Sequence, residues 1–179
     1  MNAKHDAVLA ENCAALAEHS LPRWRDLPDL PLYMDQVLGL IDRYLGAYPG
    51  FDVKGLTASM VNNYVKLGVM PPPVKKKYTR AHLAHLVAIC LLKPTLPIAS
   101  VQKIIAHELE NASEEAVYDH FCDTFERTNR AAAEAALAEA DTHSTPLSPL
   151  YHAALLAQAE RALALRLYAA YFPPEQKNK

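Results

Sequence analysis

The stretch between Asp52 and Glu108 contains eight basic residues and no acidic residue. The eight are Lys54, Lys66, Lys75, Lys76, Lys77, Arg80, Lys93 and Lys103. Because the whole chain holds 18 Lys and Arg against 20 Asp and Glu, its formal charge of −2 combines +8 in this block with −10 elsewhere. A block of one sign is typical of a surface that meets phosphate groups. The alternative is a solvated basic face without a partner.

The run Asn62-Asn63-Tyr64-x-Lys66 within this block carries groups that suit a DNA duplex. Asparagine can make two hydrogen bonds to the edge of adenine in the major groove, and lysine pairs with phosphate. The hydroxyl of Tyr64 could also donate to a phosphate. In the alternative interpretation, Tyr64 packs in the core and the two asparagines are simply hydrated.

Three consecutive lysines, Lys75 to Lys77, follow the prolines at 71–73 and precede Tyr78 and Arg80. We expect this basic segment to project toward the DNA backbone or the minor groove, and we count Tyr78 and Arg80 among the DNA-binding residues. The alternative is a solvating run that keeps an exposed edge soluble.

No set of residues in the sequence indicates catalysis, a metal or a cofactor. His82 and His85 are three residues apart, but no third ligand follows at a usable spacing, so we expect them to pack. The chain has no glycine-rich phosphate loop and no Gly-x-Ser-x-Gly elbow. A further polar cluster is expected to form a solvated helix face; its members are Asp119, His120, Asp123 and Glu126. We therefore predict a protein that is not an enzyme.

The elements that position these residues can be read from the prolines, which break helix interiors. The proline-free runs long enough for helices are 32–48, 50–70, 74–93, 98–145 and 150–172. Thr57, Thr79 and Ser113 are expected to begin helices, and Gly68 to end one. Only the segment Val74 to Tyr78 suggests a short strand. The sequence predicts an all-α fold with, at most, one short basic wing hairpin.

The basic block resembles the DNA-binding head of MerR-type winged helix-turn-helix regulators. The matching residues are Tyr64, Lys66, Gly68, Pro71, Pro72, Tyr78 and Thr79. This resemblance implies a recognition helix at 57–67 and a basic wing at 74–78, both contacting double-stranded DNA. The chain departs from the family where Asn62-Asn63 replaces Arg-Tyr, and in a shorter wing that lacks the usual glycine turn.

A second resemblance covers roughly residues 20–125. The segments that start at Leu21 (Leu-Pro-Arg-Trp), Tyr33 (Tyr-Met-Asp-Gln-Val) and Asn62 (Asn-Asn-Tyr-Val-Lys) look like the bacterial family called domain of unknown function eighteen thirty-six. This resemblance names no activity. It implies that the segment from Leu21 folds together with the basic block, and we expect Trp24 to pin that segment to the core.

Three units are predicted: a helical or flexible segment at 1–20, the winged helix-turn-helix domain at 21–107, and a C-terminal helical bundle at 108–179. The stretch 108–145 carries 10 acidic and two basic residues, so it should be repelled by DNA, and would either flank the basic head or bind it in an inactive state. In 150–172, 18 of 23 residues are apolar without a continuous polar face. We expect this helix to form a homodimer, the alternative being a core within one chain.

The compartment follows from what the sequence lacks. The three cysteines are far apart, the first 20 residues include Asp6, Glu11 and Glu18, and no apolar run is long enough to cross a membrane. We therefore expect a cytoplasmic protein without membrane contact. The function predicted is a DNA-binding transcriptional regulator, with operator and effector unspecified. The alternative is a protein–protein interaction module with a basic surface.

Overall fold

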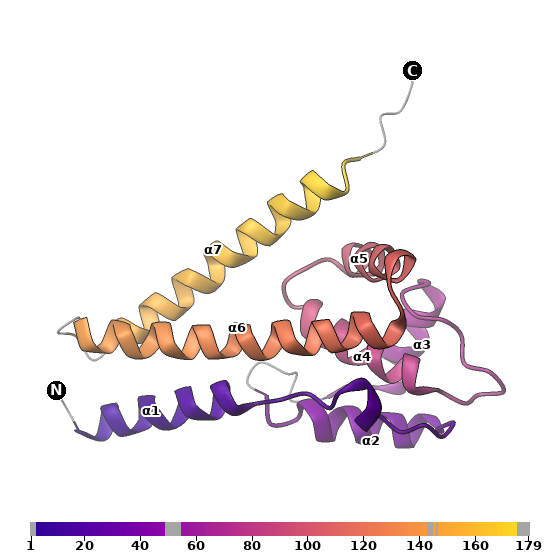
Figure 1. The fold of residues 1–179 in the computed structure, drawn as a ribbon, viewed down its shortest axis with the longest axis horizontal. Coiled ribbons are helices and arrows are strands. Elements are labelled where there is room, and N and C mark those ends of the chain that lie inside the picture. Colours follow the sequence, from indigo (N-terminus) through magenta and orange to yellow (C-terminus); the bar gives the residue numbers. More distant parts are fainter. Residues whose placement is uncertain (1–2, 49–54, 143–144, 146, 175–179) are drawn as a thin grey trace.

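The computed structural model describes residues 3–48, 55–142, 145 and 147–174. Within them, the regular elements are seven α-helices and one short 3-10 helix (Figure 1). In chain order these are α1 (Ala3–Glu18), η1 (Trp24–Asp26), α2 (Met34–Leu45), α3 (Ala58–Lys66), α4 (Arg80–Leu92), α5 (Ile98–Asn111), α6 (Glu114–Thr142) and α7 (Ser148–Tyr171). The predicted all-α fold is confirmed.

The strand expected at Val74 to Tyr78 is wrong. Single backbone bridges pair Val74 with Lys77 and Leu32 with Tyr78, and neither extends into a strand. Two residues separate Val74 from Lys77, and the ladder does not continue beyond this pair, because Pro73 has no backbone N–H and Tyr78 pairs with Leu32 instead.

Helix α4 lies at the centre of the head, which we define as α2 to α5. Eight of its 13 residues are buried, in agreement with a sequence that is apolar all round. Its neighbours contribute one-sided apolar faces to the same core: Val37, Ile41 and Leu45 from α2, Val61 and Tyr64 from α3, and Val101 from α5. Burying both sides of α4 requires helices on both sides of it, and this requirement sets the layout of the head.

The predicted helix boundaries are confirmed by the caps. The Oγ1 of Thr57 accepts from the backbone N–H of Met60 at 3.3 Å, and the Oγ of Ser113 accepts from Ala116 at 3.2 Å. Gly68 follows α3 with φ = +68°, the left-handed conformation in which glycine is favoured at a helix end. At the start of α4 the backbone N–H of Thr79 donates to Nδ1 of His82 at 3.0 Å, so the imidazole completes the cap.

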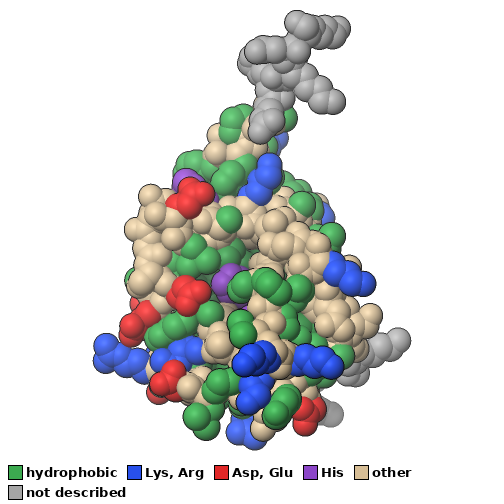
Figure 2. Space-filling view, turned by 90° about the vertical axis from the view of Figure 1, so that its right-hand side faces the viewer, with side chains coloured by type: hydrophobic (Ala, Val, Ile, Leu, Met, Phe, Trp, Pro, Cys, Tyr) green, Lys and Arg blue, Asp and Glu red, His purple; other side chains and the backbone are tan. Residues whose placement is uncertain are grey.

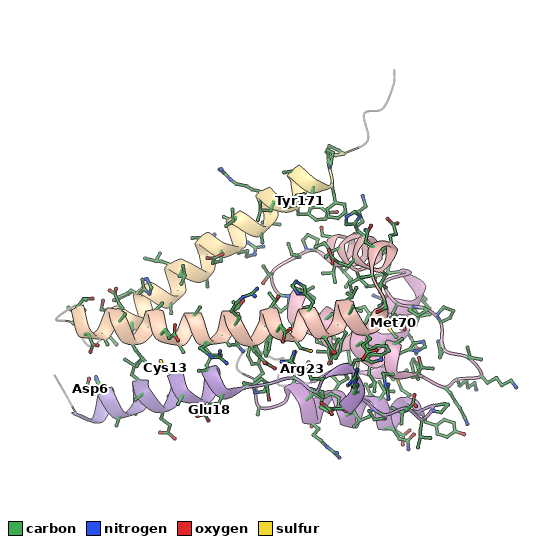
Figure 3. The ribbon with its side chains drawn as sticks, viewed as in Figure 1. Asp6, Cys13, Glu18, Arg23, Met70 and Tyr171 are labelled. Atoms are coloured by element: carbon green, nitrogen blue, oxygen red, sulfur yellow. The ribbon has the colours of Figure 1, made fainter. Side chains whose placement is uncertain are left out.

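Helix α6 has 29 residues and extends far beyond the head, and α1 lies along this extension (Figure 1). Cys13 is buried and sits on the side of α1 that faces α6 (Figure 3). Opposite, Asn129 and Ala133 of α6 are buried too. The segment 1–20, which we predicted as helical or flexible, thus contains a helix that packs on the C-terminal region.

The segment 21–27 fastens the head to α6. The backbone N–H of Trp24 donates to Oδ1 of Asp119 at 2.7 Å, and the guanidinium of Arg23 lies 2.7 Å from both Asp123 and Glu126 (Figure 3). The indole of Trp24 packs against Tyr118 with 6.4 Å between ring centroids. The expectation that Trp24 pins this segment is confirmed. The expected solvated face is confirmed for His120 and Asp123, which are exposed, but Asp119 and Glu126 are half-buried where they hold a segment about 100 residues earlier in the chain.

Helix α7 follows α6 closely only near its own start and then diverges from it (Figure 1). Pro149 is its one buried residue, and large apolar side chains along it are exposed. Its far end returns to the head, where Phe172 packs against His107 of α5 with 5.7 Å between ring centroids. None of the helices in the described ranges is long and apolar enough to cross a membrane.

Candidate nucleic-acid interface

One face of α3 is polar and open to solvent. Its side chains are Ser59, Asn62, Asn63 and Lys66, at the i, i+3, i+4, i+7 spacing of a single helix face. Together with Met60 they line a shallow depression. The opposite face carries the buried Val61 and Tyr64. The inner apolar stripe therefore fixes which way α3 turns and presents both asparagines together with Lys66 to the solvent.

A tight turn of lysines follows α3. The backbone N–H of Lys77 donates to the carbonyl of Val74 at 3.0 Å. Between them, Lys75 has φ = 51° and Lys76 has φ = 62°. Positive φ at both central residues is the geometry of a type I′ turn, which strongly favours Asn-Gly. An L-residue other than glycine in this region costs about 1–2 kcal/mol. Both lysines are exposed, so this backbone strain places two ammonium groups side by side at the tip of a turn.

The base of the turn is anchored in the core. Leu32 and Tyr78 exchange two backbone hydrogen bonds of 2.8 Å each, and the side chain of Tyr78 is buried. Lys77 is half-buried, and its ammonium lies 5.3 Å from the centroid of the Tyr33 ring. The hairpin is thus short and anchored at its base, and Lys75 and Lys76 project from it. We call residues 74–77 the wing.

Helix α5 braces the end of α3. The side chain of Gln102 donates to the carbonyl of Gly68 at 3.0 Å. A Cβ added at Gly68 would lie 3.1 Å from this amide nitrogen and would also require the strained φ of +68°. Val69 and Met70, which follow, are buried. The polar face of α3 and the wing therefore keep a fixed position relative to one another.

Basic side chains gather on one end of the molecule. The loop between α3 and α4 projects from the head in Figure 1, and the face turned toward this end shows Lys and Arg side chains collected across its lower part in Figure 2. In the described part of the chain, no ion pair links Lys75, Lys76 or Lys77 to an acidic residue. Of the basic block, Lys54 lies outside the described residues.

Two tyrosines predicted at the interface are not presented at the surface. Tyr64 and Tyr78 are buried, with 6% and 3% of their area exposed. Burial raises the pKa of both phenols, and for Tyr64 the nearby Lys93 opposes that rise. A side chain enclosed in the core cannot contact a phosphate. The structure thus agrees with the alternative in which Tyr64 packs, and we leave both tyrosines out of the interface.

Arg80 is also occupied within the chain. Its Nε donates to the carbonyl of Leu27 at 3.0 Å, and its guanidinium stacks over Trp24, 5.6 Å from the ring centroid. A third contact reaches Asp29 at 3.6 Å. These contacts make Arg80 part of the bridge between segment 21–27 and α4. Of the predicted site residues, the structure exposes Asn62, Asn63 and Lys66 together on one face of α3, and Lys75 and Lys76 at the tip of the wing, with Lys77 half-buried at its base.

Two structural roles were not foreseen from the sequence. Arg23 clamps Asp123 and Glu126, and His82 caps α4 through its Nδ1. In a capping box the second side chain stands three residues after the N-cap, which is the position of His82 relative to Thr79, so this spacing could have predicted the cap. For Arg23 no local signal exists, because its partners are brought near only by the fold. The possibility that the acidic stretch 108–145 binds the basic head gains no support. Among the described residues, the ion pairs of this stretch join its acids to Arg23, Arg25 and His107, and none joins them to a lysine of the basic block.

The comparison with known families gives one match. A family model described as Domain of unknown function (DUF1836) matches residues 22–121. The matched range runs from segment 21–27 through the head and into the first two turns of α6, so it includes the polar face of α3, the wing and Arg23, whereas Asp123 and Glu126 lie just beyond it. No curated protein and no solved structure matches the chain.

Proposed function

This chain belongs to the DUF1836 family, and we propose that it is a cytoplasmic DNA-binding regulator that contacts duplex DNA with α3 and the wing. Its head would act as a winged helix-turn-helix of the MerR type, with α3 as the recognition helix. The observation that carries the proposal is the wing turn, in which Lys75 and Lys76 both take left-handed backbone conformations.

The strain of that turn argues against a merely solvating role. A hairpin that served only stability would favour Asn-Gly at these two positions, and lysines that served only solubility could stand at any exposed position. Here the chain bears about 1–2 kcal/mol at each lysine. Strain at an exposed turn is explained when the turn makes a contact elsewhere. Two adjacent ammonium groups at the tip of a short, anchored hairpin suit the phosphates of a nucleic-acid backbone.

The polar face of α3 supplies the sequence-reading part of the proposal. Asn62 and Asn63 are exposed next to Lys66, so a helix docked in a major groove would present two amides to base edges and one cation to a phosphate. The apolar stripe on the other face anchors α3 in the core of the head, and the Gln102–Gly68 bond fixes its end. A rigid helix loses little entropy when it binds, which favours recognition by this surface.

The regulator would be a homodimer held by α7. Every fourth residue of this helix from Tyr151 to Tyr171 is apolar, and these residues form one continuous ridge: Tyr151, Leu155, Ala159, Leu163, Leu167 and Tyr171. All of them are exposed in the single chain. A ridge with i+4 spacing interlocks with the same ridge of a second copy at a crossing angle of about −50°. An apolar stripe of this length left bare would cause aggregation, and paired half-sites on DNA require a two-fold protein.

Salt dependence of duplex binding tests the proposed function. In the basic block, four described lysines are exposed and two are half-buried. We therefore expect a log–log slope of roughly −4 to −5 per chain, at about −0.9 per phosphate. The double substitution Lys75→Ala/Lys76→Ala should flatten it by about two units. Arg127→Ala/Arg130→Ala, which removes the same charge from exposed positions of α6, is the matched control and should leave the slope unchanged. Absence of binding at low salt, or equal slopes in both variants, would contradict the proposal.

A further inference from the structure

A cavity of about 240 Å³ opens where α4, α5 and α6 meet, with Trp24 at its edge. No residue of α3 or of the wing lines it. Its volume is just below the roughly 300–1,000 Å³ of sites that hold drug-sized ligands, so it suits a somewhat smaller molecule. A groove for a docking helix would need room for several anchor side chains along its length. The dimensions therefore favour a small ligand.

The cavity exists because α4 contributes small alanine side chains where the neighbouring helices contribute large apolar ones. Ala81, Ala84 and Ala88 lie at i, i+3 and i+7 on one face of α4. On the facing helices, Ile104, Ile105 and Phe121 are only half-buried although they pack against the core, and Val117 is half-buried too. Interiors normally fill such space to crystal-like density. Small residues repeated on one face thus keep an apolar chamber open in an otherwise well-packed head.

The charged side chains that line the chamber are acidic, whereas Trp24, Tyr118 and Thr124 also bring hydrogen-bond donors to its lining. Glu108 and Glu114 line it and are exposed, and no lysine or arginine is among the described residues around it. The Nδ1 of His85 lies 2.8 Å from the carbonyl of Ala81. A carbonyl can only accept, so Nδ1 donates to it, and in the neutral ring Nε2 is an acceptor. The two glutamates, with no basic side chain in the lining, therefore favour a ligand that carries positive charge.

We infer that this chamber binds a small organic cation: a compact aliphatic or aromatic body that carries an ammonium group. The body would lie against the alanines of α4 and against Phe121, where burial of apolar area stabilises it. The ammonium would face Glu108 and Glu114 and could donate to Nε2 of His85. A carboxylate of the same shape would be repelled by both glutamates. The site does not depend on DNA binding.

Three probes of nearly equal shape test the inference: cyclohexylmethylammonium, cyclohexylmethanol and cyclohexanecarboxylate. Trp24 is the one tryptophan of the chain and lines the chamber, so its fluorescence reports occupancy, with titration calorimetry as a second readout. We expect the ammonium to bind about tenfold more tightly than the alcohol, which corresponds to a pair of partly exposed ionic contacts. The carboxylate should bind most weakly.

Two variants separate the shape of the chamber from its charge. Glu108→Gln/Glu114→Gln changes only exposed side chains, and it should lower the affinity for the ammonium to that for the alcohol without altering the alcohol's own affinity. The matched control is Glu110→Gln/Glu134→Gln, which changes exposed glutamates outside the chamber. Ala88→Leu should reduce binding of all three probes by filling the space. Equal affinities for ammonium and alcohol in the unaltered protein, no response of Trp24 to any probe, or an unchanged ammonium affinity in the Glu108/Glu114 variant would overturn the inference.

Discussion

The backbone N–H of Lys77 donates to the carbonyl oxygen of Val74 at 3.0 Å, and this bond closes a turn whose two inner residues are both lysines. Because both inner residues have positive φ, the turn is locally strained. Folding stability would then favour Asn-Gly at these two positions, whereas contact with phosphate would favour lysine. This opposition can be measured.

The substitution Lys75→Asn/Lys76→Gly should stabilise the protein and weaken DNA binding. Asparagine and glycine suit the type I′ turn, but asparagine keeps part of the strain and glycine gives the unfolded chain more freedom. We therefore expect a net gain of about 1–2 kcal/mol in the free energy of unfolding, or about 2–8 °C in Tm for a chain of this length. Loss of two cations should flatten the salt slope of DNA binding by about two units. Lys75→Arg/Lys76→Arg keeps both charges and the strain, so it should change neither quantity. A stabilised variant with undiminished DNA affinity would show that the strain serves another purpose.

The exposed asparagines of α3 should read bases. On the best site selected from a random duplex library, Asn62→Ala or Asn63→Ala should cost about 1–3 kcal/mol, and on random DNA the loss should be small. Lys66→Ala should weaken both alike, because a phosphate contact carries no sequence information. Fluorescence anisotropy with the two duplexes gives the comparison. If the asparagine variants lost affinity equally on both, they would have no reading role.

His82 should make stability fall in mild acid. Burial lowers the pKa of this imidazole below its ordinary 6.5, and the nearby His85 acts in the same direction. Between the lowered and the ordinary pKa the unfolded chain therefore binds more protons than the folded one, so stability rises with pH there and is lost as pH falls below about 6.5. The contribution cannot exceed about 1.4 kcal/mol per pH unit.

The test for His82 compares slopes rather than absolute stabilities. In His82→Gln the amide oxygen can still accept from the backbone N–H of Thr79, but the side chain does not titrate. Urea unfolding between pH 5.5 and 7.5 should show a weaker pH dependence in this variant than in the unaltered protein. His120→Gln, on the exposed surface of α6, is the matched control. An identical slope in His82→Gln would exclude His82 as the source.

The apolar ridge of α7 should hold a dimer. Leu155 and Leu163 are 71% and 49% exposed in the single chain, so Leu155→Glu/Leu163→Glu should leave the fold intact and yield a monomer. Arg161→Glu lies about 160° around the helix from Leu163 and should leave the dimer intact. Deletion from Leu150 onward should give a monomer or an insoluble chain. Light scattering at tens of micromolar measures the oligomeric state. A monomeric unaltered protein would contradict the dimer and would mean that α7 is covered within one chain.

Features that depend on near neighbours in the chain were predictable from the sequence. Thr57, Gly68 and Ser113 mark helix ends because a cap or a left-handed residue acts within three or four positions. The acid-free block and the apolar stripes of α2 and α3 are likewise local patterns, and they were enough to place Asn62, Asn63 and Lys66 on an open face.

Only the tertiary structure decided which polar residues remain available to contact another molecule. Arg80 belongs to the same basic block as Lys75, yet Leu27 and Trp24 occupy it. Tyr64 stands beside the exposed Asn63, yet it turns into the core. The clamp of Arg23 on Glu126 and the packing of α1 along α6 join segments about a hundred residues apart. Burial and pairing depend on which surfaces meet, and no pattern of adjacent residues encodes that.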